Sequence, residues 1–180
     1  SRQVRPGDLF LACRGLARDG HEFIAAAVAQ GAAAIAYEVA TTEQGFNTAA
    51  VSEVPLLAIV DLAHRAGAIA ERFYDHPSRA LSVVGITGTN GKTSCSQFLA
   101  QAMNDAARPW GVIGTLGNGL VDHVVAGTHT TPDAVSLHRL LAELRAAGAR
   151  GVAMEVSSHA LDQGRVPGVQ FSAAVFTNLS

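Results

Sequence analysis

A glycine-rich segment, Gly88-Thr89-Asn90-Gly91-Lys92-Thr93, constrains the fold of this chain more than any other feature of the sequence. It follows an apolar stretch, 81–86, and precedes an amphipathic one, 93–106, which we expect to form a strand and a helix. In that setting the backbone N–H groups of the loop converge on phosphate oxygens, and the helix N-terminus adds the positive end of its dipole. The sequence therefore predicts a site for a nucleoside triphosphate.

Individual residues of this loop have distinct predicted roles. Lys92 is expected to reach the outer phosphates as a point charge and Thr93 to ligate Mg²⁺, and we count both as catalytic. The strict phosphate-loop pattern has glycine where this chain has Ile86, so the loop is a variant. A chance glycine-rich turn is the alternative, and the Gly-Lys-Thr ending between a strand and a helix argues against it. The predicted nucleotide-binding residues are Gly88, Thr89, Asn90, Gly91, Lys92 and Thr93.

Strand and helix patterns alternate along the chain and predict an α/β fold with a mainly parallel, helix-covered sheet. The expected strands span 9–13, 33–37, 56–60, 81–86, 111–114, 151–156 and 171–176. The expected helices span 22–30, 61–74, 93–106 and 133–147, with Asp61 as an N-cap. The polar segment 75–79 contains a proline and interrupts the alternation, so we place a domain boundary between residues 77 and 78.

Composition excludes several classes of protein. Hydrophobic residues make up 48% of the chain and charged residues 16%, which favours a compact fold over disorder. The formal net charge is −2 with the basic residues scattered, so we expect no nucleic-acid partner. The apolar run 23–37 is interrupted by Gln30 and Gly31, so we expect no membrane insertion. Cys13 and Cys95 lack disulfide or zinc spacing, which fits a cytoplasmic protein.

Glu155 is the carboxylate that we expect beside the phosphate loop. It lies at the end of the apolar strand predicted over 151–156, and ligands of doubly wound sheets bind at the carboxyl ends of strands. We therefore predict that Glu155 holds Mg²⁺ opposite Thr93 and count it as catalytic. An ion pair with Arg165 is the structural alternative. His159 has no second histidine at ligand spacing and is left out of the predicted site.

Polar residues before and after this strand leave two interpretations open. Thr130 and Thr131 precede a predicted helix, where N-capping is the favoured role on sequence grounds. Gln163 and Arg165 belong either to a solvated loop or to a phosphate site. The residues alone do not decide between these roles.

The glycine-rich segment resembles the phosphate loop of the Mur ligase family, which tolerates the departure at Ile86. The further segments that resemble the members adding the third residue of the peptidoglycan stem peptide are 1–10, 19–24, 154–159, Gln163 and Arg165, and 176–180. Segment 19–24 is similar also to members that add the terminal dipeptide. The resemblance covers essentially the whole chain.

This resemblance implies an N-terminal UDP-substrate-binding domain, 1–77, and an incomplete central ATP-binding domain, 78–180. It implies a cytoplasmic ATP-dependent ligase of peptidoglycan precursor synthesis that uses Mg²⁺. A monomer is the favoured expectation, and the sequence does not establish the oligomeric state. Such a ligase joins a diamino acid, meso-diaminopimelate or L-lysine, to UDP-N-acetylmuramoyl-L-alanyl-D-glutamate through an acyl phosphate. The substrate-binding residues implied by the family are Ser1, Thr130, Thr131, Ser157, Gln163 and Arg165.

The chain departs from the family at two contact positions. Leu16 stands where some relatives have a nucleotide-contacting histidine, and His129 stands where some have asparagine. The family also continues past residue 180 into an Asp-His pair, a carbamylated lysine and a C-terminal domain that recognises the diamino acid. We therefore expect these 180 residues to bind nucleotide without turning over.

Two other functions remain open on the sequence. A folylpolyglutamate-synthase-like ligase shares the loop and the acyl-phosphate chemistry but lacks the uridine-binding front domain, so residues 1–75 argue against it. A non-catalytic nucleotide-binding module has no need of magnesium ligands, so Thr93 and Glu155 argue against that alternative.

Overall fold

The computed structural model describes residues 4–15, 18–40, 54–127 and 129–179. Contacts between residues divide the chain into two compact units, Ser1–Ala66 and Gly67–Ser180. This division falls inside a helix, and the domain boundary expected between residues 77 and 78 stays a prediction. Within the described ranges, no helix is both long enough and apolar enough to cross a bilayer.

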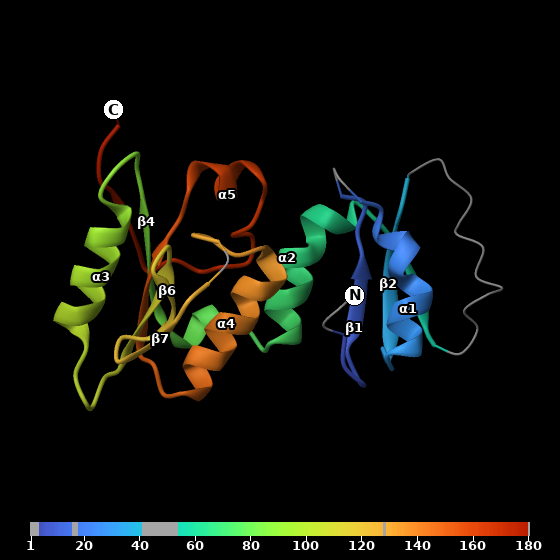
Figure 1. Cartoon of the computed structure of the whole chain (residues 1–180), viewed down its shortest axis with the longest axis horizontal. Helices are drawn as coiled ribbons and strands as arrows, with labels where there is room; N and C mark the ends of the chain where they lie inside the picture. Colours follow the sequence, from blue (N-terminus) through green and yellow to red (C-terminus); the bar gives the residue numbers. More distant parts are fainter. Residues whose placement is uncertain (1–3, 16–17, 41–53, 128, 180) are drawn as a thin grey trace. The chain divides into compact units, whose positions relative to one another are not determined.

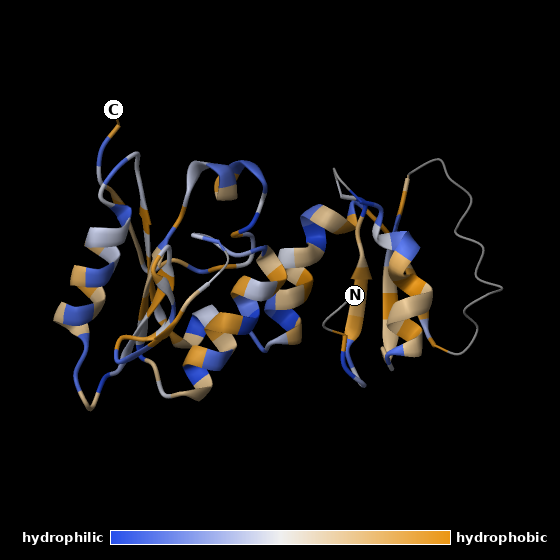
Figure 2. Ribbon diagram, in the orientation of Figure 1, coloured by the Kyte–Doolittle hydropathy of each residue, from blue (hydrophilic) through white to orange (hydrophobic). Residues whose placement is uncertain are grey.

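The first unit contains a three-stranded parallel sheet (Figure 1). Its strands are β1 (Leu9–Ala12), β2 (Ala34–Val39) and β3 (Leu56–Val60), in the order β1-β2-β3. The 3-10 turn η1 (Gly20–Phe23) and helix α1 (Ile24–Ala29) connect β1 to β2, and helix α2 (Leu62–Phe73) follows β3. Ile24 and Ala27 of α1 pack against Ile35 of β2 in a buried core. Figure 2 shows the hydrophobic residues concentrated along β1 and β2.

The second unit is built on a six-stranded sheet in the order β7-β6-β5-β8-β4-β9. Its strands are β4 (Ser82–Thr87), β5 (Trp110–Gly114), β6 (Gly117–Leu120), β7 (His123–Val125), β8 (Gly151–Glu155) and β9 (Ala173–Phe176). The four strands β5, β8, β4 and β9 are parallel, whereas β6 and β7 form an antiparallel extension. The connections include helices α3 (Lys92–Met103), α4 (Ala134–Ala146) and α5 (Ser158–Asp162), and the 3-10 turn η3 (Pro77–Ala80) precedes β4.

Side chains of the central strand β8 alternate between two cores, as expected for a strand that is covered on both faces. Val152 and Met154 pack in the cluster that contains Leu141 of α4. Ala153 points the other way and packs with Ala100 of α3. The α/β fold with mostly parallel strands that the sequence predicts is therefore confirmed.

Most expected elements are present, with ends that differ by at most three residues. The strand expected over 56–60 has those bounds, while the helix expected over 93–106 begins at Lys92 and ends at Met103. The helix expected over 22–30 is a 3-10 turn followed by α1. Four elements were not predicted: strands β6 and β7, which form a hairpin, the short helix α5 and the turn η3.

The expected helix caps differ in outcome. Asp61 stands at the N-cap position of α2, because its main-chain oxygen accepts from the N–H of Arg65 at 3.2 Å, although its φ is 58° and its side chain bonds to the ring of His64. The favoured capping role of Thr130 and Thr131 is wrong. Asp133 caps α4 instead, since it has extended backbone and its side chain accepts a hydrogen bond from the N–H of Ser136 at 3.0 Å.

The N-cap at Asp133 is expected to contribute to the free energy of unfolding. The change Asp133→Ala removes the acceptor for an N–H in the first turn of α4, and we expect it to lower the free energy of unfolding by about 1 kcal/mol. Asp133→Asn keeps an acceptor and serves as the matched control. Urea unfolding followed by the fluorescence of Trp110, which is the single tryptophan and is buried in β5, measures both. Equal stability of the alanine variant and the wild type would contradict the cap.

Candidate functional site

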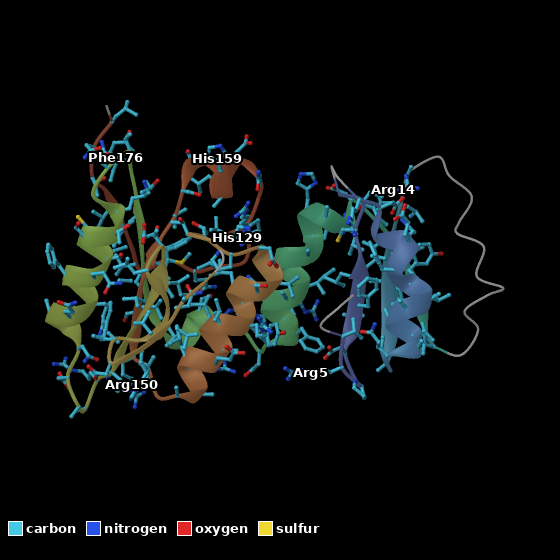
Figure 3. All side chains as sticks on the ribbon, viewed as in Figure 1. Arg5, Arg14, His129, Arg150, His159 and Phe176 are labelled. Carbon is cyan, nitrogen blue, oxygen red and sulfur yellow. The ribbon has the colours of Figure 1, made fainter. Side chains whose placement is uncertain are left out.

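The residues predicted to bind nucleotide lie at the carboxyl edge of the parallel strands in the second unit. The loop 88–91 follows β4, Glu155 ends β8, and residues 177–178 follow β9, which pairs with β4. Figure 3 shows His159 and Phe176 at this end of the unit and Arg150 at the opposite end. The topology therefore brings together side chains that lie far apart in the sequence, as is usual for ligand sites in such sheets.

Two glycines give the phosphate loop its shape. Gly88 and Gly91 have φ values of 131° and 83°, which side chains other than glycine rarely adopt. Gly91 is the residue before the first turn of α3. Because the first N–H groups of a helix have no partner within that helix, the start of α3 presents donors suited to an anion.

Lys92 folds back over the loop. Its Nζ donates to the carbonyl oxygens of Gly88 at 2.6 Å and Thr89 at 3.0 Å. The ammonium group therefore lies at the loop itself, with its charge compensated by main-chain carbonyl groups. An outer phosphate offers a stronger, charged acceptor for the same group.

The carboxylate of Glu155 is buried and accepts three hydrogen bonds. Glu155 is only 1% exposed to solvent. Oε2 accepts from the hydroxyls of Thr93 at 2.9 Å and Thr115 at 3.2 Å, and Oε1 accepts from the N–H of Thr115 at 2.8 Å. The alternative role, an ion pair between Glu155 and Arg165, is not what these contacts show, since Arg165 donates to Thr131 O at 2.7 Å instead.

Thr93 and Glu155 offer two oxygens at a spacing that would suit neighbouring ligands of one Mg²⁺ ion. Neighbouring ligands of an octahedral magnesium ion lie roughly 2.8–3.0 Å apart, because each is about 2.0–2.1 Å from the metal. Thr93 Oγ1 and Glu155 Oε2 are 2.9 Å apart. The described residues contain no group of three His, Cys, Asp or Glu side chains suited to a metal. Mg²⁺ needs no such group, because it commonly binds through one or two protein oxygens, phosphates and water.

Five of the predicted substrate residues form a polar layer beside this carboxylate. Thr131 Oγ1 donates to the main-chain oxygen of Glu155 at 2.9 Å and accepts from the N–H of Ser157 at 3.2 Å. Thr130 Oγ1 lies 3.0 Å from Thr115 Oγ1. Arg165 donates to Gln163 Oε1 from Nε at 3.0 Å and Nη2 at 2.5 Å.

Ser157 combines two contacts at the start of α5. Its side chain caps that helix by accepting from the N–H of Ala160 at 3.1 Å.

Two positions with a predicted or doubtful substrate contact, Ser1 and Leu16, fall outside the described residues. His129 and His159 are both exposed, and their roles stay untested.

Three residues that contact the site were not predicted as site residues. Thr115 binds Glu155 through both its N–H and its hydroxyl, and Thr177 and Asn178 bind the phosphate loop. Thr177 and Asn178 follow the predicted strand 171–176, so their position at a strand's carboxyl end is the signal that could have identified them.

Comparison with known sequence families assigns both halves of the chain. Residues 86–180 match the Mur ligase middle domain, and residues 1–74 match the profile described as the Mur ligase family, catalytic domain.

Curated relatives are similar over the same residues. The UDP-N-acetylmuramoyl-L-alanyl-D-glutamate--2,6-diaminopimelate ligase of Pseudomonas aeruginosa is 53% identical over 180 residues, which are 100% of this chain and 36% of the relative. The protein of that name from Coxiella burnetii is 51% identical, with the same coverage. The chain thus spans about a third of the length of these relatives.

Solved structures agree on the fold. A structure titled UDP-N-acetylmuramoyl-L-alanyl-D-glutamate--2,6-diaminopimelate ligase has a TM-score of 0.77 at 32% identity and covers 99% of this chain and 35% of its own. The MurF ligase from Thermotoga maritima in complex with ADP is similar in fold, with a TM-score of 0.66 at 21% identity. The match covers 98% of this chain and 36% of the MurF chain. Because a Mur ligase profile matches more than half of its residues, this chain belongs to the Mur ligase family.

Proposed function

We propose that this chain supplies the UDP-substrate-binding and ATP-binding parts of a ligase that adds a diamino acid to UDP-N-acetylmuramoyl-L-alanyl-D-glutamate. The observation that carries this proposal is the pairing of Thr93 with the buried Glu155 directly beside a phosphate loop. The names of the relatives support a UDP-muramoyl peptide over a folate as the substrate.

The first step of the proposed reaction requires the γ-phosphoryl group of ATP to be held and its charge neutralised. The N–H groups at the start of α3 and the Lys92 ammonium bind the phosphate oxygens. When Lys92 moves from the carbonyl groups of Gly88 and Thr89 to the phosphates, its charge remains within the loop. This positioning is the main contribution that a protein makes to phosphoryl transfer.

Thr93 and Glu155 would hold Mg²⁺, which neutralises the charge that develops on the phosphate oxygens when it is bound. The side chain of Glu155 is kept in place by the N–H and hydroxyl of Thr115, so its oxygen stays aimed at Thr93. Gly114 leaves room for this arrangement, since a Cβ there would collide with the Glu155 carboxylate.

The polar layer next to Glu155 would receive the second substrate. Ser157 and Arg165 are joined to Glu155 through hydrogen bonds centred on Thr131, and the Thr130 hydroxyl bonds to that of Thr115. We propose that Thr130, Thr131, Ser157, Gln163 and Arg165 contact the sugar and peptide of the UDP-substrate. The proposed contact by Ser1 lies outside the described residues.

In the proposed reaction, a carboxylate oxygen of the UDP-linked dipeptide attacks the γ-phosphorus, and the bond from that phosphorus to the bridging oxygen of ADP breaks. The acyl phosphate formed is then attacked by the amine of the diamino acid. The amine loses a proton, the tetrahedral intermediate collapses, and inorganic phosphate leaves as the amide forms. The site residues align the carboxylate and the triphosphate for the first of these steps.

Calorimetric titration of the purified protein tests the two proposed ligands separately. We expect it to bind UDP-N-acetylmuramoyl-L-alanyl-D-glutamate, and also to bind a non-hydrolysable ATP analogue with Mg²⁺. Binding of the ATP analogue without any binding of the UDP-peptide would contradict the proposed substrate and leave only nucleotide binding.

Lys92 provides a direct prediction for nucleotide affinity. Lys92→Ala removes a charged donor from the loop, and we expect the Kd for the ATP analogue to rise at least tenfold, since hydrogen bonds to charged groups contribute about 1.5–3 kcal/mol. Arg150→Ala is the matched control, because this exposed cation lies at the opposite end of the unit (Figure 3). Binding of the UDP-peptide should persist in both variants. Unchanged nucleotide affinity in Lys92→Ala would refute the role of Lys92.

Glu155 provides a prediction for magnesium dependence. Glu155→Gln keeps the shape and an acceptor for the N–H of Thr115 but removes the charge that suits Mg²⁺. We expect the ATP analogue to bind this variant with the same Kd in the presence and absence of Mg²⁺, whereas Mg²⁺ strengthens binding to the wild type. Glu143→Gln on α4 is the control, because its side chain is 61% exposed. A magnesium effect of wild-type size in Glu155→Gln would exclude the proposed ligand.

A further inference from the structure

Thr177 and Asn178, the two residues that follow β9, are hydrogen-bonded to the phosphate loop. The N–H of Thr177 donates to Thr87 O at 2.9 Å, which extends the pairing of β9 with β4. Beyond it, the Thr177 hydroxyl lies 2.6 Å from Asn90 O and 3.2 Å from Thr87 O. A hydroxyl has one proton, and the shorter contact reaches across to the loop itself.

Asn178 binds the loop with three groups. Its side-chain oxygen accepts from the N–H of Asn90 at 3.1 Å, and its side-chain nitrogen lies 3.3 Å from Asn90 O. Its main-chain oxygen accepts from the N–H of Thr89 at 3.1 Å. A side-chain amide has both a donor and an acceptor, so asparagine can bind both peptide groups of Asn90, whereas aspartate cannot.

Gly88 allows this close approach. A Cβ at Gly88 would collide with the Thr177 hydroxyl and would lie 2.9 Å from the main-chain oxygen of Asn178. The segment after β9 is therefore in direct contact with the loop backbone as well as hydrogen-bonded to it. Because Gly88 also has a positive φ, two independent constraints require glycine at this position.

The hydrogen bonds to Asn178 occupy some of the N–H groups of the loop. Those of Thr89 and Asn90 bind Asn178, whereas the first N–H groups of α3 have no partner within that helix and are available to a triphosphate. A glycine-containing loop loses conformational entropy when it is fixed, and a contact that fixes it in advance removes that cost from ligand binding. The residues that fix the loop therefore influence affinity without touching the ligand.

We propose that Thr177 and Asn178 are positioning residues that hold the phosphate loop in the conformation that accepts a triphosphate. This inference rests on the proposed function of the loop. It goes beyond that function by assigning part of the nucleotide affinity to two residues far from the loop in sequence. Thr177 lies 87 residues and Asn178 lies 88 residues after Asn90.

Three substitutions test the proposal by titration of the purified protein with a non-hydrolysable ATP analogue and Mg²⁺. Thr177→Val keeps the shape but removes the hydroxyl, and we expect the Kd to rise about tenfold, as for the loss of one or two hydrogen bonds. Thr177→Ser keeps the hydroxyl and should bind within about twofold of the wild type. Asn178→Asp loses the donor and adds a negative charge near the loop, so its Kd should rise at least as much as that of Thr177→Val. Ser172→Ala, before β9, is the matched control and should not change the Kd.

The comparison with Lys92→Ala separates this inference from the proposed function. If Lys92→Ala weakens nucleotide binding while Thr177→Val and Asn178→Asp bind like the wild type, the positioning role is wrong and the nucleotide site stands. If Thr177→Ser weakens binding as much as Thr177→Val, the hydroxyl is not the cause and the inference also fails. Absence of nucleotide binding by the wild type would overturn the proposed function, and the inference with it.

Discussion

The buried carboxylate of Glu155 links the segments that form the site. A buried charge is tolerated only when hydrogen-bond donors replace the water that it loses, and Thr93 and Thr115 supply those donors from segments after β4 and β5. The Thr131 hydroxyl adds a bond to the main-chain oxygen of the same residue. The pairing of β8 between β5 and β4 places Glu155 among them. A slip of β8 by one residue would turn this carboxylate to the other face of the sheet, so its donors also fix the strand register.

The sequence predicted the elements whose signals are local. The strand at 151–155 is a continuous buried run, and α3 follows a glycine-rich loop that marks its start. The β6–β7 hairpin was missed because its first strand contains Gly117 and Gly119, and glycine is a poor indicator of a strand. Both glycines have positive φ, and a Cβ on either would collide with a carbonyl oxygen of the neighbouring strand. These glycines permit a close approach that only the paired structure reveals.

The site was predictable where a motif marks the residues and unpredictable where topology alone brings them together. The phosphate loop and the strand-terminal Glu155 carry such signals, and the structure places Thr93 and Glu155 in contact. Thr115 follows the predicted strand 111–114 and so has only the strand-end position as a signal, since its bond to Glu155 spans 40 residues and depends on β5 and β8 being neighbours. The capping role expected for Thr130 and Thr131 failed because Asp133, closer to α4, supplies a carboxylate acceptor.

The departure from the strict phosphate-loop pattern at Ile86 has a structural reason. Ile86 is 1% exposed and lies in β4, where it packs with Ala100 of α3 and Ala153 of β8. At this position a large side chain stabilises the contact between sheet and helix, and glycine would leave a cavity there. The turn into the loop starts later, at Gly88, where the positive φ and the contact with Asn178 both require glycine. Glycine is therefore required at position 88, where the segment after β9 contacts the loop. Position 86 lies before that contact and can hold a large core side chain.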